Sequence, residues 1–327
     1  VFLPFAIACT FSEETQPYRA RRDGPRWVRV ARRPRRLSTF GLVKIRNGTI
    51  ELHVAEDGDP SAPPILLLHG ITSFGGTWDW FVPELAERFR VLRLDFRGHG
   101  ASDRAPGEYT TAGYVSDAVA AIEQVAGQPC VVIGHSLGGA TAAALTQRHA
   151  DLVVGAVMED PPLGRAGNSP ERTDQTLLDG FRLMRSSIPQ MQSTGMTREV
   201  LAGILAAAPG TSGSTFGATL HTDGISAMAG SMLTVEAAVL DPVLDGTIGT
   251  FLDADVAFGA PSLIVCADPD VPGAVADPAL ARHFADISPR VDVRIVDGAG
   301  HLIHDELAAR HIFRDEAIEF IDRTVAS

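Results

Sequence analysis

The feature that most constrains the fold is the segment Gly134-His135-Ser136-Leu137-Gly138, which matches the pattern G-x-S-x-G. An apolar run at 130–134 precedes it, and an alanine-rich, helix-like segment at 137–148 follows it. A serine at a sharp turn from strand to helix projects its hydroxyl from the carboxyl end of a sheet, and the flanking glycines relieve crowding there. The dipole and free N–H groups at the start of the helix suit a developing negative charge. The pattern therefore predicts that Ser136 is a nucleophile.

Strand-like and helix-like segments alternate on both sides of this turn. A hairpin is predicted at 40–46 and 50–55, joined at Asn47-Gly48. Continuous apolar runs fit strands that are buried on both faces, as in a parallel sheet. One such run lies at 65–68, further strands are predicted at 91–95, 130–134, 153–158, 262–266 and 291–296, and helices are expected at 111–125, 137–148, 277–286 and 304–321. The order predicts an α/β fold with a doubly wound, mostly parallel sheet.

The alternation stops at Asp160-Pro161-Pro162 and resumes near residue 259. Residues 161–258 show short helical patterns, many glycines and no apolar strand, and they contain five of the six methionines. We interpret this segment as a helical cap domain inserted after the sixth strand, which leaves 39–160 and 259–327 as the core. Methionine packs irregular shapes, so these side chains form the core of the cap, an apolar wall over a ligand, or both.

Charge and composition exclude several other classes of protein. The net charge is −12, but residues 1–38 carry nine arginines against three acidic residues, so the remainder is more acidic still. An acidic body repels nucleic acid, and no run approaches the ~18 consecutive apolar residues of a membrane span. We therefore expect no nucleic-acid partner and no membrane partner. Residues 1–38 are predicted to be a basic, disordered extension. Three cysteines without CxxC spacing predict a cytoplasmic protein without disulfides.

Three further motifs accompany the serine turn, in the chain order that one family shows. They are His69-Gly70 after the first buried strand, Asp95-Phe96-Arg97-Gly98-His99-Gly100-Ala101-Ser102 after the next, and Gly298-Ala299-Gly300-His301 near the end. Over about residues 40–325, the chain resembles an α/β-hydrolase with a cap domain. The resemblance implies that His301 takes the proton of Ser136. It also implies an oxyanion hole formed by the backbone N–H groups of Ile71 and Leu137.

The carboxylate that orients His301 has two candidate positions. The position usual in this fold follows the strand at 262–266 and indicates Asp270, or its neighbour Asp268, although Ala267 stands where the family commonly has glycine. The other candidate is Asp160, at the end of the strand at 153–158. There the chain resembles haloalkane dehalogenases and zearalenone lactone hydrolases, whose acid follows that same strand.

Glu159, next to Asp160, is expected to point away from it because side chains alternate along a strand. Phe74 and Trp78 follow the loop of the oxyanion hole and are candidates for the wall of a substrate pocket. No metal and no organic cofactor are expected.

The resemblance implies a hydrolase that cleaves a carboxylic ester or lactone through an acyl-enzyme. The predicted cap has four phenylalanines, five methionines and no tryptophan, which favours a small apolar substrate. Two alternatives remain open: a hydrolase of carbon–carbon bonds of the meta-cleavage type, and a non-catalytic ligand receptor on the same scaffold. Epoxide hydrolases and haloalkane dehalogenases use an aspartate where this chain has Ser136, and we set them aside. The sequence leaves an oligomer open.

Overall fold

The sheet is built as the alternating pattern predicts. In the computed structural model, which describes residues 39–164, 175–210 and 213–326, eight strands lie in the order β1-β2-β4-β3-β5-β6-β7-β8. β1 and β2 form the predicted hairpin, β2 pairs antiparallel with β4, and all later neighbours pair in parallel. The strands are β1 (Thr39–Asn47), β2 (Ile50–Asp57), β3 (Pro64–Leu68), β4 (Arg90–Asp95), β5 (Cys130–His135), β6 (Val153–Glu159), β7 (Ser262–Ala267) and β8 (Val291–Val296). The predicted fold class is confirmed, while the prediction for residues 1–38 lies outside the described residues.

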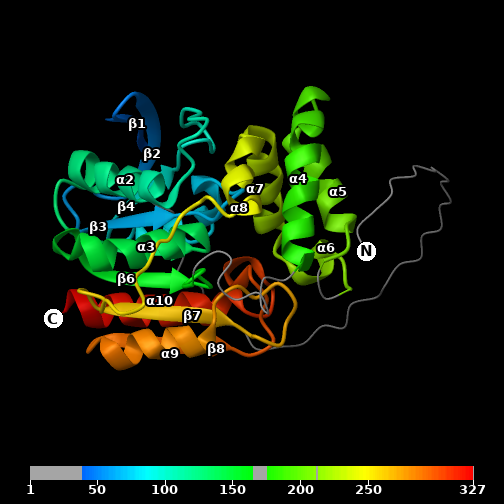
Figure 1. Ribbon diagram of the computed structural model, residues 1–327. Helices are drawn as coiled ribbons and strands as arrows, with labels where there is room; N and C mark the ends of the chain where they lie inside the picture. The colour runs from blue at the N-terminus through cyan, green and yellow to red at the C-terminus, as the bar shows by residue number, and fades with distance from the viewer. Residues whose placement is uncertain (1–38, 165–174, 211–212, 327) are drawn as a thin grey trace, which may run out of the picture. The chain divides into compact units, whose positions relative to one another are not determined.

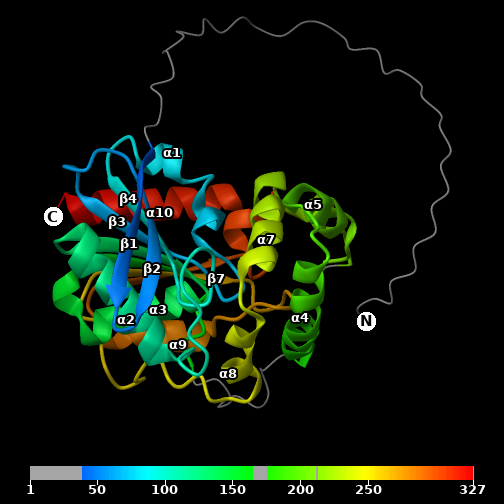
Figure 2. The ribbon, with the colours of Figure 1, turned by 90° about the horizontal axis from the view of Figure 1, so that it is seen from above.

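Strand β3 shows why continuous apolar runs fit the centre of this sheet. Leu66 and Leu68 join one hydrophobic core cluster, whereas Ile65 and Leu67 join the cluster on the opposite face. Because side chains alternate along a strand, a strand covered on both faces is apolar throughout. Figure 2 shows α2, α3 and α9 on one side of the strands and α1 and α10 on the other. These helices are α1 (Val82–Leu85), α2 (Thr111–Ala121), α3 (Leu137–Arg148), α9 (Pro278–Ile287) and α10 (Arg310–Val325).

The last helix begins later than the sequence predicted. The pattern places its start at residue 304, but α10 begins at Arg310, and Ile303–Asp305 form a separate 3-10 turn, η5. The carbonyl oxygens that a helix from residue 304 would use have other donors: that of Asp305 accepts the backbone N–H of His221 at 2.8 Å, and that of His304 accepts the Nε–H of Arg310 at 2.6 Å. A tertiary contact therefore overrides the local helical preference in this segment.

Helices occupy the segment between β6 and β7, as expected for a cap. They are α4 (Gln175–Ser193), α5 (Arg198–Ala207), α6 (Phe216–Thr219), α7 (Thr222–Thr234) and α8 (Asp241–Leu244), and we call them the cap helices. Figure 1 shows α4, α5, α6 and α7 grouped off the ends of the strands. The cap helices belong to the same compact unit as the sheet, and the boundaries 161 and 258 stay a prediction.

The apolar residues of the cap divide into two groups. Leu201, Ala229 and Met232 are buried together, with Met184, Met191, Met196 and Met228 packed against them. This packing is that of a small helical core. Two of the four phenylalanines, Phe251 and Phe258, are instead buried in the main core. Phe258 stacks on Phe284 of α9, with ring centroids 4.7 Å apart, so its ring does not form a cap wall. Among the described residues, no single helix is long and apolar enough to cross a membrane, although the bent pair Thr222–Thr234 and Ala237–Leu244 passes the same test together.

Candidate active site

The turn from β5 into α3 has the strained geometry that the G-x-S-x-G pattern predicts. Ser136 has φ 51° and ψ −113°, a conformation that residues with a side chain rarely adopt. A Cβ at Gly134 would lie 2.2 Å from the carbonyl oxygen of Gly138, and a Cβ at Gly138 would lie 2.3 Å from the carbonyl oxygen of Leu68. Only glycine fits at these two positions, because the backbone segments approach each other too closely for any side chain.

Backbone strain gathers around this turn. Among the described residues, the non-glycine residues with positive φ are Thr72 (69°), Ser136 (51°) and Asp160 (40°). They follow β3, β5 and β6, three neighbouring parallel strands whose carboxyl ends meet at one end of the sheet. Each such conformation costs about 1–3 kcal/mol and persists only where the surroundings enforce it, as at functional sites.

Asp160 is the carboxylate that the structure brings to His301. Its Oδ2 lies 2.7 Å from His301 Nδ1, and because a carboxylate only accepts, the imidazole proton is on Nδ1. The side chain of Asp160 is fully buried. Its two oxygens also accept the backbone N–H groups of Ala267, Val275 and Ala276 at 2.9–3.0 Å. Four donors thus fix one carboxylate and, through it, the orientation of the imidazole ring.

Asp270 lies elsewhere. Its side chain is exposed, and its backbone N–H donates to Asp268 Oδ1 at 2.9 Å. Asp268 in turn accepts the backbone N–H of Gly298 at 2.7 Å, as a carboxylate that stabilises a turn does. The structure therefore brings Asp160 together with His301, and it uses the region of Asp268 and Asp270 for turn geometry.

The loop of the predicted oxyanion hole lies against Ser136. A Cβ at Gly70 would lie 2.8 Å from His135 Nδ1 and 3.4 Å from Ser136 Cβ, so this glycine lets the loop approach the nucleophile. Ile71 follows Gly70 directly, and Leu137 is the first residue of α3. The first N–H groups of a helix have no partner within it. Both predicted donors therefore stand beside Ser136, and their role stays a prediction.

The two aromatic residues of the same loop have different surroundings. Phe74 is half-buried, and the guanidinium of Arg198, from α5, lies 5.9 Å from the centre of its ring, so Phe74 stands between the core and the cap. Trp78 is fully buried and stacks on His304 at 4.8 Å and on Phe313 at 6.1 Å. Trp78 is thus a core residue, and our expectation that it lines a pocket is corrected here.

A second buried acid–histidine pair lies next to the first, and the sequence analysis missed it. Glu159 accepts the His304 Nδ1–H at 2.8 Å and the His304 backbone N–H at 2.8 Å. Burial alone would lower the pKa of His304, but the charges of Glu159 and Asp305 and the hydrogen bond to Glu159 raise it to about 9. A signal was present in the sequence: two adjacent acids end one strand, and two histidines three residues apart follow another.

His135 stands between the two pairs. Its ring centroid lies 4.6 Å from that of His301 and 4.9 Å from that of His304. Burial and the neighbouring rings of His301 and His304 hold the pKa of His135 well below its usual value. His135, Glu159 and His304 carry ligand atoms within 4.8 Å of one another. The hydrogen bonds of these groups within the protein account for the cluster, and we assign no metal to it.

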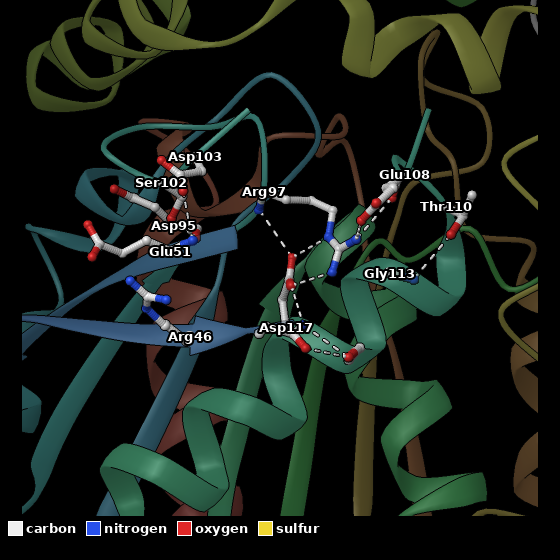
Figure 3. A network of polar contacts seen from close by, with 12 residues as sticks. Arg46, Glu51, Asp95, Arg97, Ser102, Asp103, Glu108, Thr110, Gly113 and Asp117 are labelled. Atoms are coloured by element: carbon white, nitrogen blue, oxygen red, sulfur yellow. Dashed lines mark hydrogen bonds and ion pairs between the residues drawn. The ribbon is translucent and has the colours of Figure 1, made fainter. Parts of the chain in front are cut away.

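The loop after β4 carries the Asp-Phe-Arg-Gly-His-Gly motif and has a different chemistry. Figure 3 shows Arg97 clamped on Asp117 of α2. Its Nε and Nη2 donate to the two carboxylate oxygens at 2.9 and 2.7 Å, and its backbone N–H donates to Oδ2 at 3.1 Å. Asn47 adds a further hydrogen bond to Asp117 at 2.8 Å. The network fixes a loop beside the site and offers no group that exchanges a proton at neutral pH.

The strand order, the strained serine turn and the Asp160–His301 pair define an α/β-hydrolase architecture. A family model described as the alpha/beta hydrolase family matches residues 65–311, more than half of the chain. The protein therefore belongs to the alpha/beta hydrolase family, which confirms the predicted class and leaves the substrate open.

Curated relatives match over shorter stretches. The 2-(acetamidomethylene)succinate hydrolase of Mesorhizobium japonicum is 34% identical over 113 residues, which cover 35% of this chain and 40% of that protein. Epoxide hydrolase 3 of Xenopus tropicalis is 30% identical over 125 residues, which cover 37% of this chain and 34% of that protein. The matches thus span less than half the length of these relatives.

Solved structures match over most of the chain. The crystal structure of E-2-(acetamidomethylene)succinate hydrolase has a TM-score of 0.65 at 22% identity and covers 86% of this chain and 99% of its own. Est816, described as an N-acyl homoserine lactone degrading enzyme, has a TM-score of 0.61 at 20% identity and covers 85% of this chain and 100% of its own. At these identities the similarity shows the fold alone.

Proposed function

We propose that the protein is a serine hydrolase that cleaves a carboxylic ester or lactone through an acyl-enzyme. The observation that carries the proposal is the 2.7 Å contact between Asp160 and His301, at the same end of the sheet as the strained Ser136 turn. With Nδ1–H donated to Asp160, the other imidazole nitrogen, Nε2, is the free base that a serine nucleophile requires.

The proposed reaction uses three side chains and two backbone groups. Ser136 Oγ attacks the substrate carbonyl carbon while His301 Nε2 takes its proton. The N–H groups of Ile71 and Leu137 hold the oxyanion, and each such donor contributes about 3 kcal/mol in the transition state. The ester C–O bond breaks, and His301 returns the proton to the departing alcohol. Water activated by His301 then releases the acid. Asp160 keeps the imidazole in the correct tautomer throughout.

The proposed substrate class rests on Ser136 and on the cap helices. Ser136 forms a hydrolysable ester intermediate with an acyl group, and this favours esters and lactones over epoxides. Solved structures with this fold include a thermophilic esterase and a lactone-degrading enzyme. Met184 and Met191 pack against both the cap cluster and the main core, which favours an apolar substrate between cap and sheet.

The test is hydrolysis of p-nitrophenyl butyrate, with Ser136→Ala as the blank. We expect nitrophenolate release by the wild type well above that blank. A panel of lactones and bulkier esters, followed by acid release, then defines the preferred substrate. A wild type that matches its blank on every ester and lactone contradicts the proposal and favours a non-catalytic ligand receptor.

A further inference from the structure

The last residue of β6 and the residue that follows it each hold one histidine of the same turn. Glu159 and Asp160 contact His304 and His301 respectively. The two histidines are three residues apart in the turn between β8 and α10, which contains η5. Two anchors fix both the position and the orientation of a turn, whereas a single contact leaves it free to rotate.

The Glu159–His304 pair is closed off from solvent. The exposed fractions of the two side chains are 0% and 1%. His304 Nε2 lies 3.1 Å from Thr77 Oγ1, and Trp78 stacks on the imidazole at 4.8 Å. A buried ion pair gains little net stability, because removing both charges from water costs about as much as their attraction returns. Stability alone therefore does not account for a charged pair at this place.

Backbone contacts join this pair to His301. His135, directly before Ser136, donates its Nε2–H to the carbonyl oxygen of His301 at 2.9 Å. Arg310 of α10 donates its Nε–H to the carbonyl oxygen of His304 at 2.6 Å. The main chain of the turn is thus held at both histidines, and the ring of His304 forms its buried end.

We propose that Glu159 and His304 form a positioning pair, which sets where His301 presents its Nε2 to Ser136. The inference rests on the proposed function, since it gives His301 the role of base. Neither residue touches the substrate, and both act through the turn. Catalytic groups must be held within about 0.5 Å of the productive geometry by neighbours that are themselves fixed, and the buried pair provides such support.

The charge of the pair depends on its surroundings. His304 faces Glu159 of β6, Asp305 of η5, Arg310 of α10 and His135 of β5. At neutral pH the pair is Glu159 carboxylate with His304 imidazolium, because the pKa of His304 is about 9. Above that pH the imidazolium loses its proton, and the turn loses its ion pair and keeps the hydrogen bond between His301 and Asp160.

The experiment compares Glu159→Gln with a matched control, Glu56→Gln. Glu56 forms a two-bond pair with Arg90 at 2.8 and 3.1 Å, at the opposite end of the sheet, with side-chain exposures of 10% and 17%. The readout is the rate at which a fluorophosphonate labels the protein. In that reaction Ser136 Oγ bonds to phosphorus, the P–F bond breaks, fluoride leaves and His301 takes the proton, so no knowledge of the substrate is required.

We expect Glu159→Gln to slow labelling at least about tenfold at a temperature where it is folded, and Glu56→Gln to label at the wild-type rate. If p-nitrophenyl butyrate is turned over, kcat falls in the same proportion while KM stays unchanged. We also expect the labelling rate of the wild type to fall as pH rises through about 9. The labelling rate of Glu159→Gln should show no such fall at alkaline pH.

The double variant E159Q/H304Q guards against simple misfolding, because it removes both charges and leaves no lone buried ion. It is expected to recover the melting temperature but not the labelling rate. A double variant that recovers both, or a Glu159→Gln that labels like the wild type, overturns the positioning role. A wild type that neither labels nor hydrolyses esters overturns the proposed function, and this inference with it.

Discussion

Two loops at the carboxyl end of the sheet use the same device with opposite consequences. The loop after β4 is fixed by the buried Asp117 carboxylate on Arg97, and the turn after β8 is fixed by buried carboxylates on His301 and His304. A guanidinium keeps its charge at every physiological pH, whereas an imidazole gains and loses a proton near neutrality. The first clamp therefore only shapes the site, while the second presents a base. The partner of the buried carboxylate, a guanidinium or an imidazole, decides which loop carries chemistry.

The sharpest way to break this comparison is Asp160→Asn. An asparagine keeps the shape but allows the wrong tautomer of His301, so we expect kcat to fall by about 10³-fold or more. Asp270→Asn is the matched control, since Asp270 is exposed, and its kcat is expected to stay within about twofold of the wild type. Steady-state rates of both variants on p-nitrophenyl butyrate decide whether Asp160 or Asp270 is the acid. If only Asp270→Asn is inactive, the assignment of the acid is wrong.

The same change in the other loop should affect stability instead. Asp117→Asn leaves the buried Arg97 with only the exposed Glu108, at 3.2 Å, as a counter-charge, and breaking a buried pair in this way costs about 3–5 kcal/mol. Urea unfolding should show this loss. The kcat of the folded fraction should remain within about twofold of the wild type. A large fall in kcat, measured where the variant is fully folded, would mean that the β4 loop takes part in the chemistry.

Alkaline pH should weaken the ion pair of the turn after β8 and leave the Arg97–Asp117 pair of the loop after β4 unchanged. The folded-state pKa of His304, about 9, lies above its ordinary value of 6.5. The stability that follows is fully present below about pH 6.5 and is lost as pH rises through about 9, in total on the order of 3 kcal/mol. The check is the urea midpoint at neutral pH and above pH 9. E159Q/H304Q should lose less over this interval than the wild type, and an equal loss would count against the ion pair.

The smallest effect is expected where the cap touches the oxyanion loop. Ser231 of α7 donates its hydroxyl to the carbonyl oxygen of Thr72, one of the three strained residues. Ser231→Ala should lower stability by about 1 kcal/mol and reduce kcat/KM only a few-fold. Unfolding midpoints and steady-state kinetics measure the two quantities. An inactive but stable Ser231→Ala would show that the cap controls the oxyanion loop directly.

Local patterns were enough for the fold and for part of the site. Ser136 and His301 could be singled out because each stands in a glycine-rich turn that follows a predicted strand. The choice between Asp160 and Asp270 could not be made, because it depends on which carboxylate the folded chain directs at His301. Trp78 was placed on a pocket wall because a motif position does not reveal burial. The start of α10 was misplaced because His221, far away in the sequence, donates its backbone N–H to the carbonyl oxygen of Asp305.

The account's central claim is that Ser136 becomes acylated during turnover. The most direct measurement is to quench the wild type during hydrolysis of p-nitrophenyl butyrate and to map the modified peptide by mass spectrometry. We predict a butyryl group on the peptide that contains Ser136, and none on Ser136→Ala. Turnover without acylation of Ser136, or with the butyryl group on another residue, would contradict the account.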